Sequence, residues 1–350
     1  MKKLIPALAL LLVSAVLLAT SSFAWFSMNT TVTVTGMEVK TKVSSNLQIK
    51  EDTLGSTARI ADANFTTAVD ESTTYATPAL LEPVSTVDGV AFFYTTNALS
   101  NGDAAADDYT AYNAVEAPTS DELTAFNTRY GSTGAVGYVD YVFQLKAVNT
   151  ANAGKDIKIT KLDLIYGGAS DTSKAYRVAL FVENLGETGT APAGGSGELK
   201  GIYAPSGATN QTANKAVSAT DAAPTTISTT AYNTVSNIAT VPAEKTNYYK
   251  VVIRLFLEGE DTTCKNDTYA ALTGNWKLNL ELKLDDADTT NTAVTSIAKY
   301  TTATVSATTY YYDGSTYLWT DIANIGTTTG RTAIASAASE VQTAFGYVAP

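Results

Sequence analysis

Strict alternation of apolar and polar residues is the feature that most restricts the fold of this chain. Between Trp276 and Leu284 every second residue is Trp or Leu, and the residues between them are Lys, Asn or Glu. A period of two places alternate side chains on opposite faces of a strand. The segment therefore predicts a strand with one face in a hydrophobic core and the other in water.

The same period recurs along the chain. Strands are predicted at residues 29–40, 138–147, 157–164, 176–182, 248–258 and 276–284. The alternation changes parity near Gly36 in the first of these segments and near Thr160-Lys161 in the third, which indicates β-bulges. The segment 176–182 is apolar except for Arg177, which is enough to predict burial on both faces.

Loops of uneven length separate these strands, and no long stretch has the periodicity of a helix. Residues 51–130 are polar and irregular, and residues 183–247 are rich in Gly, Ala, Thr, Ser and Asn. We expect long surface loops there, with one short strand in the second region. The pattern predicts an all-β fold: an antiparallel β-sandwich of jelly-roll type with long loop insertions.

The beginning of the chain has the pattern of a secretory signal peptide, predicted over residues 1–24. Two lysines precede an apolar run at 4–19, and Ser22 and Ala24 supply small residues for cleavage before Trp25. The alternative is an uncleaved membrane helix, which needs about 20 apolar residues. We expect a protein that is secreted or associated with the cell surface. Only an uncleaved signal segment would contact the membrane.

Composition excludes several classes of function. Histidine is absent, which rules out Ser-His-Asp and Cys-His nucleophile systems and His-ligated zinc sites. Glycosidases can work with carboxylates alone, but no pair stands out among the 34 acidic residues. The net charge of −11 disfavours nucleic acid and anionic lipid as partners. We expect no enzymatic activity, no cofactor and no nucleic acid partner.

Two acidic clusters and one cysteine are candidate sites. The first cluster surrounds Cys264, and the second follows the strand at 276–284; their acids are Glu258, Glu260, Asp261 and Asp267, then Asp285, Asp286 and Asp288. Carboxylates could bind calcium, but neither spacing fits an EF-hand. We expect solvated loop charges and no metal site. The lone cysteine is either buried as a small apolar residue or links two copies.

Residues 289–350 are predicted to form a small extension rich in Thr and Tyr. Asp313-Gly314 is typical of a type I′ hairpin turn between aromatic strands, and residues 333–345 could form a short helix. Tyr312 and Trp319 are the best candidates for a strip that binds a ligand. The alternative role for both side chains is packing against the sheet.

Two segments resemble the TasA/camelysin (CalY) family of bacterial biofilm-fibre and surface proteins. One is the junction TSSFAWF at 20–26, which is followed by the strand TTVTVTGMEVK. The other is YVDYVFQLKAVNTANAGKDIKITKLDL at 138–164, which looks like the family's strand, Asn-rich turn and strand. The resemblance implies a jelly-roll subunit whose freed N-terminal strand completes the sheet of the next copy.

On this resemblance, residues 29–40 are the exchange strand of a sandwich domain spanning 25–288. The side chains it would donate are Val32, Val34, Met37 and Val39. We therefore expect a secreted structural subunit of a cell-surface or biofilm-matrix fibre. Its partners would be copies of itself, with other matrix proteins or polysaccharide as further partners. The alternative is a monomeric surface adhesin or carbohydrate-binding protein.

Overall fold

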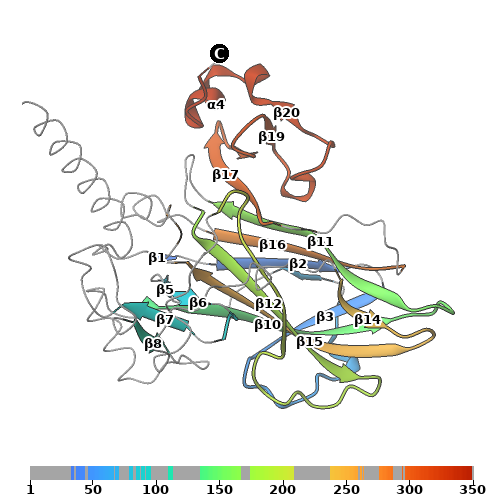
Figure 1. Ribbon diagram of the computed structural model, residues 1–350. Helices are drawn as coiled ribbons and strands as arrows, with labels where there is room; N and C mark the ends of the chain where they lie inside the picture. Colours follow the sequence, from blue (N-terminus) through green and yellow to red (C-terminus); the bar gives the residue numbers. More distant parts are fainter. Residues whose placement is uncertain are drawn as a thin grey trace, which may run out of the picture.

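Two large β-sheets packed face to face form the body of the protein in the computed structural model (Figure 1). The structure describes residues 33–34, 37–43, 46–66, 68–70, 79–81, 84–86, 88–90, 92–95, 109–112, 135–166, 174–208, 237–258, 261, 263, 276–286, 294 and 296–348. Strands dominate these ranges, so the all-β prediction is confirmed. No helix among the described residues is long and apolar enough to cross a membrane.

The first large sheet has five strands and is antiparallel throughout. Its order is β13-β12-β15-β10-β3. The strands are β3 (Leu47–Asp52), β10 (Tyr138–Val148), β12 (Tyr176–Gly186), β13 (Glu198–Tyr203) and β15 (Thr246–Leu257). Strand β15 lies at its centre and pairs along its length with β10 and β12.

The second large sheet has the order β20-β19-β18-β17-β11-β16-β2-β4, and β14 pairs with β11 beside this path. Its strands are β2 (Met37–Val43), β4 (Ala68–Asp70), β11 (Lys155–Tyr166), β14 (Asn237–Val241), β16 (Trp276–Asp286), β17 (Ala298–Val305), β18 (Thr308–Tyr312), β19 (Tyr317–Trp319) and β20 (Thr332–Ala333). Strand β2 is parallel to β16, and β17 is parallel to β11. The sandwich is therefore mixed in this sheet rather than purely antiparallel.

Short elements complete the described chain. One small sheet joins β1 (Thr33–Val34), β5 (Ala79–Leu81) and β9 (Ala135–Val136), and another joins β6 (Ser85–Thr86), β7 (Phe92–Thr95) and β8 (Tyr109–Tyr112). The helical segments are η1 (Asp62–Asn64), η4 (Ile322–Asn324), η5 (Ile334–Ser336) and α4 (Ser339–Ala344). The last two occupy the region where the sequence predicts a short helix.

The core lies between the two large sheets and is built from the alternating faces that the sequence predicts. Leu278, Leu280 and Leu282 of β16 are each 1 % exposed and pack in one cluster with the alternate residues of β10, β12 and β15. The predicted bulge in β11 is also present. The pairing with β16 shifts between Ile159 and Lys161, so the apolar residues before and after the shift reach the same core.

Two expectations need correction. The described part of residues 183–247 contains two complete strands, β13 and β14, where the sequence predicts one. Strand β16 continues through Asp285 and Asp286, which pair with Asp156 and Lys155 of β11, so these two aspartates belong to a strand and not to a loop. The jelly-roll arrangement stays a prediction, because the described strand order does not establish it.

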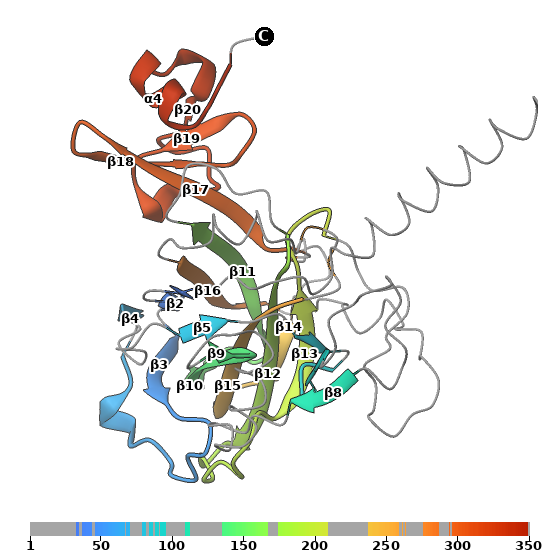
Figure 2. The same cartoon turned by 90° about the vertical axis from the view of Figure 1, so that its left-hand side faces the viewer.

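Residues 298–348 form a C-terminal lobe at one end of the sandwich (Figures 1 and 2). Strand β17 pairs with the end of β11 through residues 298–301 and then with β18 through residues 301–305. The lobe has two apolar clusters, one around Trp319 and one around Phe345. It is therefore a continuation of the second sheet that carries part of its own core.

Candidate functional site

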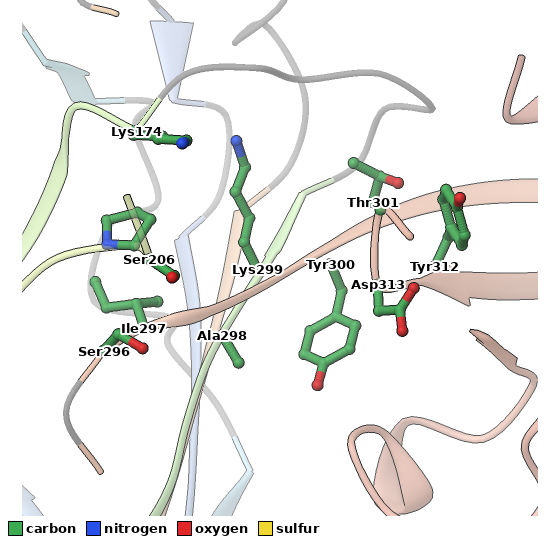
Figure 3. A pocket seen from close by; sticks show the side chains of 12 residues that line it. Lys174, Ser206, Ser296, Ile297, Ala298, Lys299, Tyr300, Thr301, Tyr312 and Asp313 are labelled. Carbon is green, nitrogen blue, oxygen red and sulfur yellow. The ribbon is translucent and has the colours of Figure 1, made fainter. Parts of the chain in front are cut away.

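A groove of about 570 Å³ lies at the root of the C-terminal lobe, where β17 leaves the sandwich (Figure 3). Strand β17 runs through it, with Lys174 and the turn after β13 on one side and the turn after β18 at one end. Small-molecule sites commonly enclose about 300–1,000 Å³. The groove has the size of such a site and is assembled from four separate parts of the chain: Lys174, residues 205–206, residues 296–301 and residues 312–314.

Backbone contacts fix the start of β17 beside the sandwich. The Ile297 N–H donates to the Ala204 carbonyl at 2.9 Å, and Ile297 also bridges to Pro205. The next residue, Ala298, aligns with Asp163 of β11. The strand is thus held on both sides at the point where the groove begins.

Lys174 and Lys299 place two positive charges on the groove. The Lys174 ammonium donates to the Gly207 carbonyl at 3.2 Å. Gly207 has φ 71°, and a Cβ on it would come within 2.7 Å of Lys174 Nζ, so glycine leaves room for this contact. The Lys299 ammonium lies 5.5 Å from the ring centroid of Tyr176, a cation–π distance. Figure 3 shows both ammonium groups on the same side of β17.

Hydroxyl groups line the groove beside the lysines. They belong to Ser206, Ser296 and Thr301. Thr301 is 8 % exposed, and its buried hydroxyl oxygen has no hydrogen-bond partner among the described residues. A buried polar group without a partner is costly, so each such group in a native protein calls for an explanation.

Asp313 closes one end of the groove and organises the turn after β18. Its Oδ1 accepts from the N–H groups of Ser315, Thr316 and Tyr317 at 2.8–3.0 Å. Strand pairing ends at Tyr312 and resumes at Leu318. The predicted hairpin is present, but the two-residue type I′ turn is wrong: the loop is longer, and the Asp313 side chain rather than a tight backbone turn closes it.

Tyr312 and Trp319 do not form a continuous strip. Tyr312 is half-buried, lines the groove and packs against Phe345 with ring centroids 5.2 Å apart. Trp319 is 4 % exposed, packs edge-on against Tyr300 and donates its indole N–H to the Thr327 carbonyl at 3.1 Å. Packing is therefore the role of Trp319, and only Tyr312 of this pair faces the groove.

A second cleft of about 480 Å³ lies between β11, β16 and the lobe. Asp163 and Glu281 line it, together with Lys161 and Tyr300. Burial raises the pKa of Asp163 to about 6, against the opposing effects of Lys161 at 3.5 Å and of a hydrogen bond from Asn279. Burial also raises the pKa of Tyr300, with Asp163 and Asp313 adding to the shift.

The first acidic cluster is not a set of solvated charges. Asp261 is 1 % exposed and forms a buried ion pair with Arg177 at 3.0 Å. Its other oxygen accepts from the N–H and hydroxyl of Thr263. Glu258 is also fully buried. Glu260, Cys264, Asp267 and Asp288 lie outside the described residues. No group of three or more possible metal ligands occurs in the part that the structure describes.

The predicted exchange strand is only partly described. Ala24, Trp25 and Val32 lie outside the described residues. Val34 belongs to β1, which pairs with β5. Met37 and Val39 belong to β2 and align with Trp276 and Leu278 of β16.

The sequence does not predict the groove, because the residues that line it come from loops and strand ends. Lys174 lies before β12 in a segment without periodicity, and Lys299 and Thr301 look like ordinary residues of a threonine-rich tail. No local signal connects them. Comparison of the chain with protein-family models, curated proteins and solved structures finds no match.

Proposed function

We propose that the protein is a secreted structural subunit of a bacterial cell-surface or biofilm-matrix fibre, assembled by exchange of strand β2 between copies. The position of β2 carries this proposal. It is the first long strand after the predicted signal segment, and all seven of its residues align with β16.

Removal of β2 would leave an incomplete sheet. Residues 276–282 of β16 would lose their partner on that side, while Leu278 and Leu280 belong to the core directly beneath. An unpaired strand edge over an apolar core gains main-chain hydrogen bonds from any strand of suitable sequence. The β2 segment of a second copy has the same sequence, so it can pair with this edge in the same way.

The outer side of β2 presents little obstacle to exchange. Its neighbour there is β4, which pairs through only three residues, 68–70. By contrast, β16 pairs with β11 over eleven aligned positions. Strand β2 can therefore leave without opening the centre of the sheet.

Exchange from one copy to the next gives a contact between unlike surfaces, which does not close on itself and so yields a filament. The TasA/camelysin resemblance supports the same assembly. Cleavage at Ala24-Trp25 would free the segment that precedes β2. Jelly-roll connectivity and extracellular location are parts of this proposal.

A disulfide test separates exchange from the closed monomer. Lys42 and Glu281 are aligned in the β2–β16 pair, and adjacent strands have a spacing that permits a disulfide. Lys42→Cys and Glu281→Cys are introduced together into the chain beginning at Trp25, with Cys264→Ser to remove the native thiol. After oxidation, exchange yields disulfide-linked ladders on non-reducing gels, and electron microscopy shows fibres.

The matched control keeps Glu281→Cys and moves the second cysteine to Lys161, which aligns with Glu281 across β11 and β16. This pair lies within one subunit and should give closed monomers under all conditions. The proposal fails if the Lys42→Cys pair also gives only closed monomers at every concentration and no fibres form.

A monomeric carbohydrate-binding protein is the second candidate. The groove beside β17 favours it, because lysine, tyrosine and hydroxyl groups converge there. Strand exchange and ligand binding use different parts of the molecule, so a fibre subunit could also bind carbohydrate.

A further inference from the structure

We propose that the groove at the root of the C-terminal lobe binds an acidic polysaccharide, a chain of sugars that carry carboxylate groups. This inference rests on the second candidate function, carbohydrate binding at this groove, and names its ligand class; it does not depend on strand exchange. It rests on charge, on an unsatisfied hydroxyl and on the shape of the groove.

The charge of the groove is opposite to that of the molecule. The chain carries 34 acidic residues against 23 basic ones, yet Lys174 and Lys299 both lie on this groove. Among the lining residues that the structure describes, Asp313 is the one acidic residue. Three backbone N–H groups already bind that carboxylate, so it contributes less negative potential than a free one. The groove is therefore a local site for an anion on an acidic protein.

The two lysines are held rather than freely extended. Lys174 is anchored by the Gly207 carbonyl, and the Lys299 stem is held with its ammonium near the Tyr176 ring. Lysine heads fixed in this way lose less side-chain entropy when a ligand binds. Two carboxylates spaced along a polymer can each form an ion pair with one of these lysines.

Thr301 supplies a second observation that points to a ligand. Its hydroxyl is buried on the groove wall without a partner among the described residues. Ser206 and Ser296 add hydroxyls that can both donate and accept. Sugar hydroxyls match such groups, whereas an acidic peptide side chain offers only acceptors. This distinction favours a saccharide over an acidic protein segment.

The aromatic wall fits the same ligand. Tyr312 lines the groove, and its ring packs against the ring of Phe345. Figure 3 shows Tyr312 and Asp313 further along β17 from the two lysines. A sugar unit against Tyr312 would leave its neighbour in the polymer close to the ammonium groups.

Isothermal titration calorimetry of the full mature chain with trigalacturonate tests the proposal. We expect binding that weakens with added salt. Trigalacturonate methyl ester, which has the same sugars without charge, should bind at least about tenfold more weakly, since ion contacts are lost. Polyglutamate should not compete.

Variants locate the site. Lys174→Ala with Lys299→Ala should lower affinity at least about tenfold, whereas Lys200→Ala with Lys245→Ala, which removes the same charge from exposed ion pairs elsewhere, should not. Thr301→Val should weaken binding about threefold to tenfold without lowering the midpoint of thermal unfolding, because it removes an unsatisfied buried hydroxyl.

Four results would overturn the proposal. They are absence of trigalacturonate binding by the parent chain, equal binding of the methyl ester, equal binding of polyglutamate, and equal loss of affinity in the two double-lysine variants. A loss of affinity in Thr301→Val that follows a loss of folding would assign that residue to structure instead.

Discussion

Arg177, Lys250 and Arg254 are buried cations on the outward face of the five-stranded sheet. Arg254 donates to both carboxylate oxygens of Asp140 at 2.7 Å and lies 4.1 Å from the ring centroid of Tyr138. Lys250 donates to the Leu54 carbonyl. The Arg254–Asp140 contact joins two neighbouring strands of the sheet, whereas the Lys250 contact fastens the segment around Leu54 over its outward face.

The Arg177–Asp261 pair gives a prediction at the residue scale. Asp261→Ala should lower the free energy of unfolding by about 3–5 kcal/mol, because it leaves the Arg177 charge buried without its carboxylate. Urea denaturation measures the change. Glu187→Ala is the control: its ion pair with Lys245 is half exposed on both sides, and its loss should cost about 0–1 kcal/mol. Equal costs would contradict the structural role of the buried pair.

At the scale of elements, the β17–β18 hairpin determines the shape of the lobe. Its turn is Ser306-Ala307, and both residues have positive φ, 50° and 64°. Two-residue hairpin turns of this kind suit the twist of the strands but normally contain Asn or Gly. The sequence predicts a turn at Asp313-Gly314 but not at Ser306-Ala307, because neither Ser nor Ala is typical of a type I′ turn.

Ala307→Gly should therefore stabilise the hairpin by about 1 kcal/mol, since glycine removes the cost of the left-handed conformation. Hydrogen exchange of the β17 and β18 amides should slow accordingly. Gly314→Ala makes the opposite change in the next loop, between β18 and β19: at φ 76° a Cβ meets no atom within 4 Å, so only backbone strain is added, and exchange of the β18 and β19 amides should quicken. Unchanged exchange in Ala307→Gly would show that the Ser306-Ala307 turn does not limit the opening of the β17–β18 hairpin.

At the scale of the whole molecule, the lobe and the sandwich meet over Asp163. This carboxyl is 3 % exposed and lies beside Lys161, Glu281 and Tyr300 in the second cleft. Its buried position couples the stability of the fold to pH. The protonated form suits the site better than the ionised form, because burial is the largest influence on its pKa.

The sign of the dependence follows from the raised pKa, about 6 against 3.8. The stabilising contribution of the neutral carboxyl is fully present below pH 3.8 and is lost as pH rises through 6. Asp163→Asn removes this titration. Relative to the variant, the parent should lose stability on the order of 3 kcal/mol between pH 4 and pH 7.5. Urea denaturation of both proteins at the two pH values measures it, and a constant difference would contradict the coupling.

The sequence by itself determined the five long strands that enclose the core, β10, β11, β12, β15 and β16. Val139, Tyr141, Phe143 and Leu145 all point into the core as alternation predicts, and the parity change in β11 marks a real bulge. These features are local. The period of two is a property of the strand backbone, and its interruption keeps the apolar side chains on the face that packs into the core. The same reasoning predicted a hairpin near Asp313 but not the length of its loop.

Only the tertiary structure determined which segments of the chain are neighbours in space. The parallel pairings of β2 with β16 and of β17 with β11 join segments far apart in the chain, and no local pattern specifies them. Burial of Asp261 depends on Arg177, 84 positions away. Lys174 lies on the same groove as Lys299 and Thr301 because folding brings together residues that are far apart in the sequence. Charge and hydroxyl groups become a site only when folding gathers them, and that convergence depends on packing rather than on any short stretch of sequence.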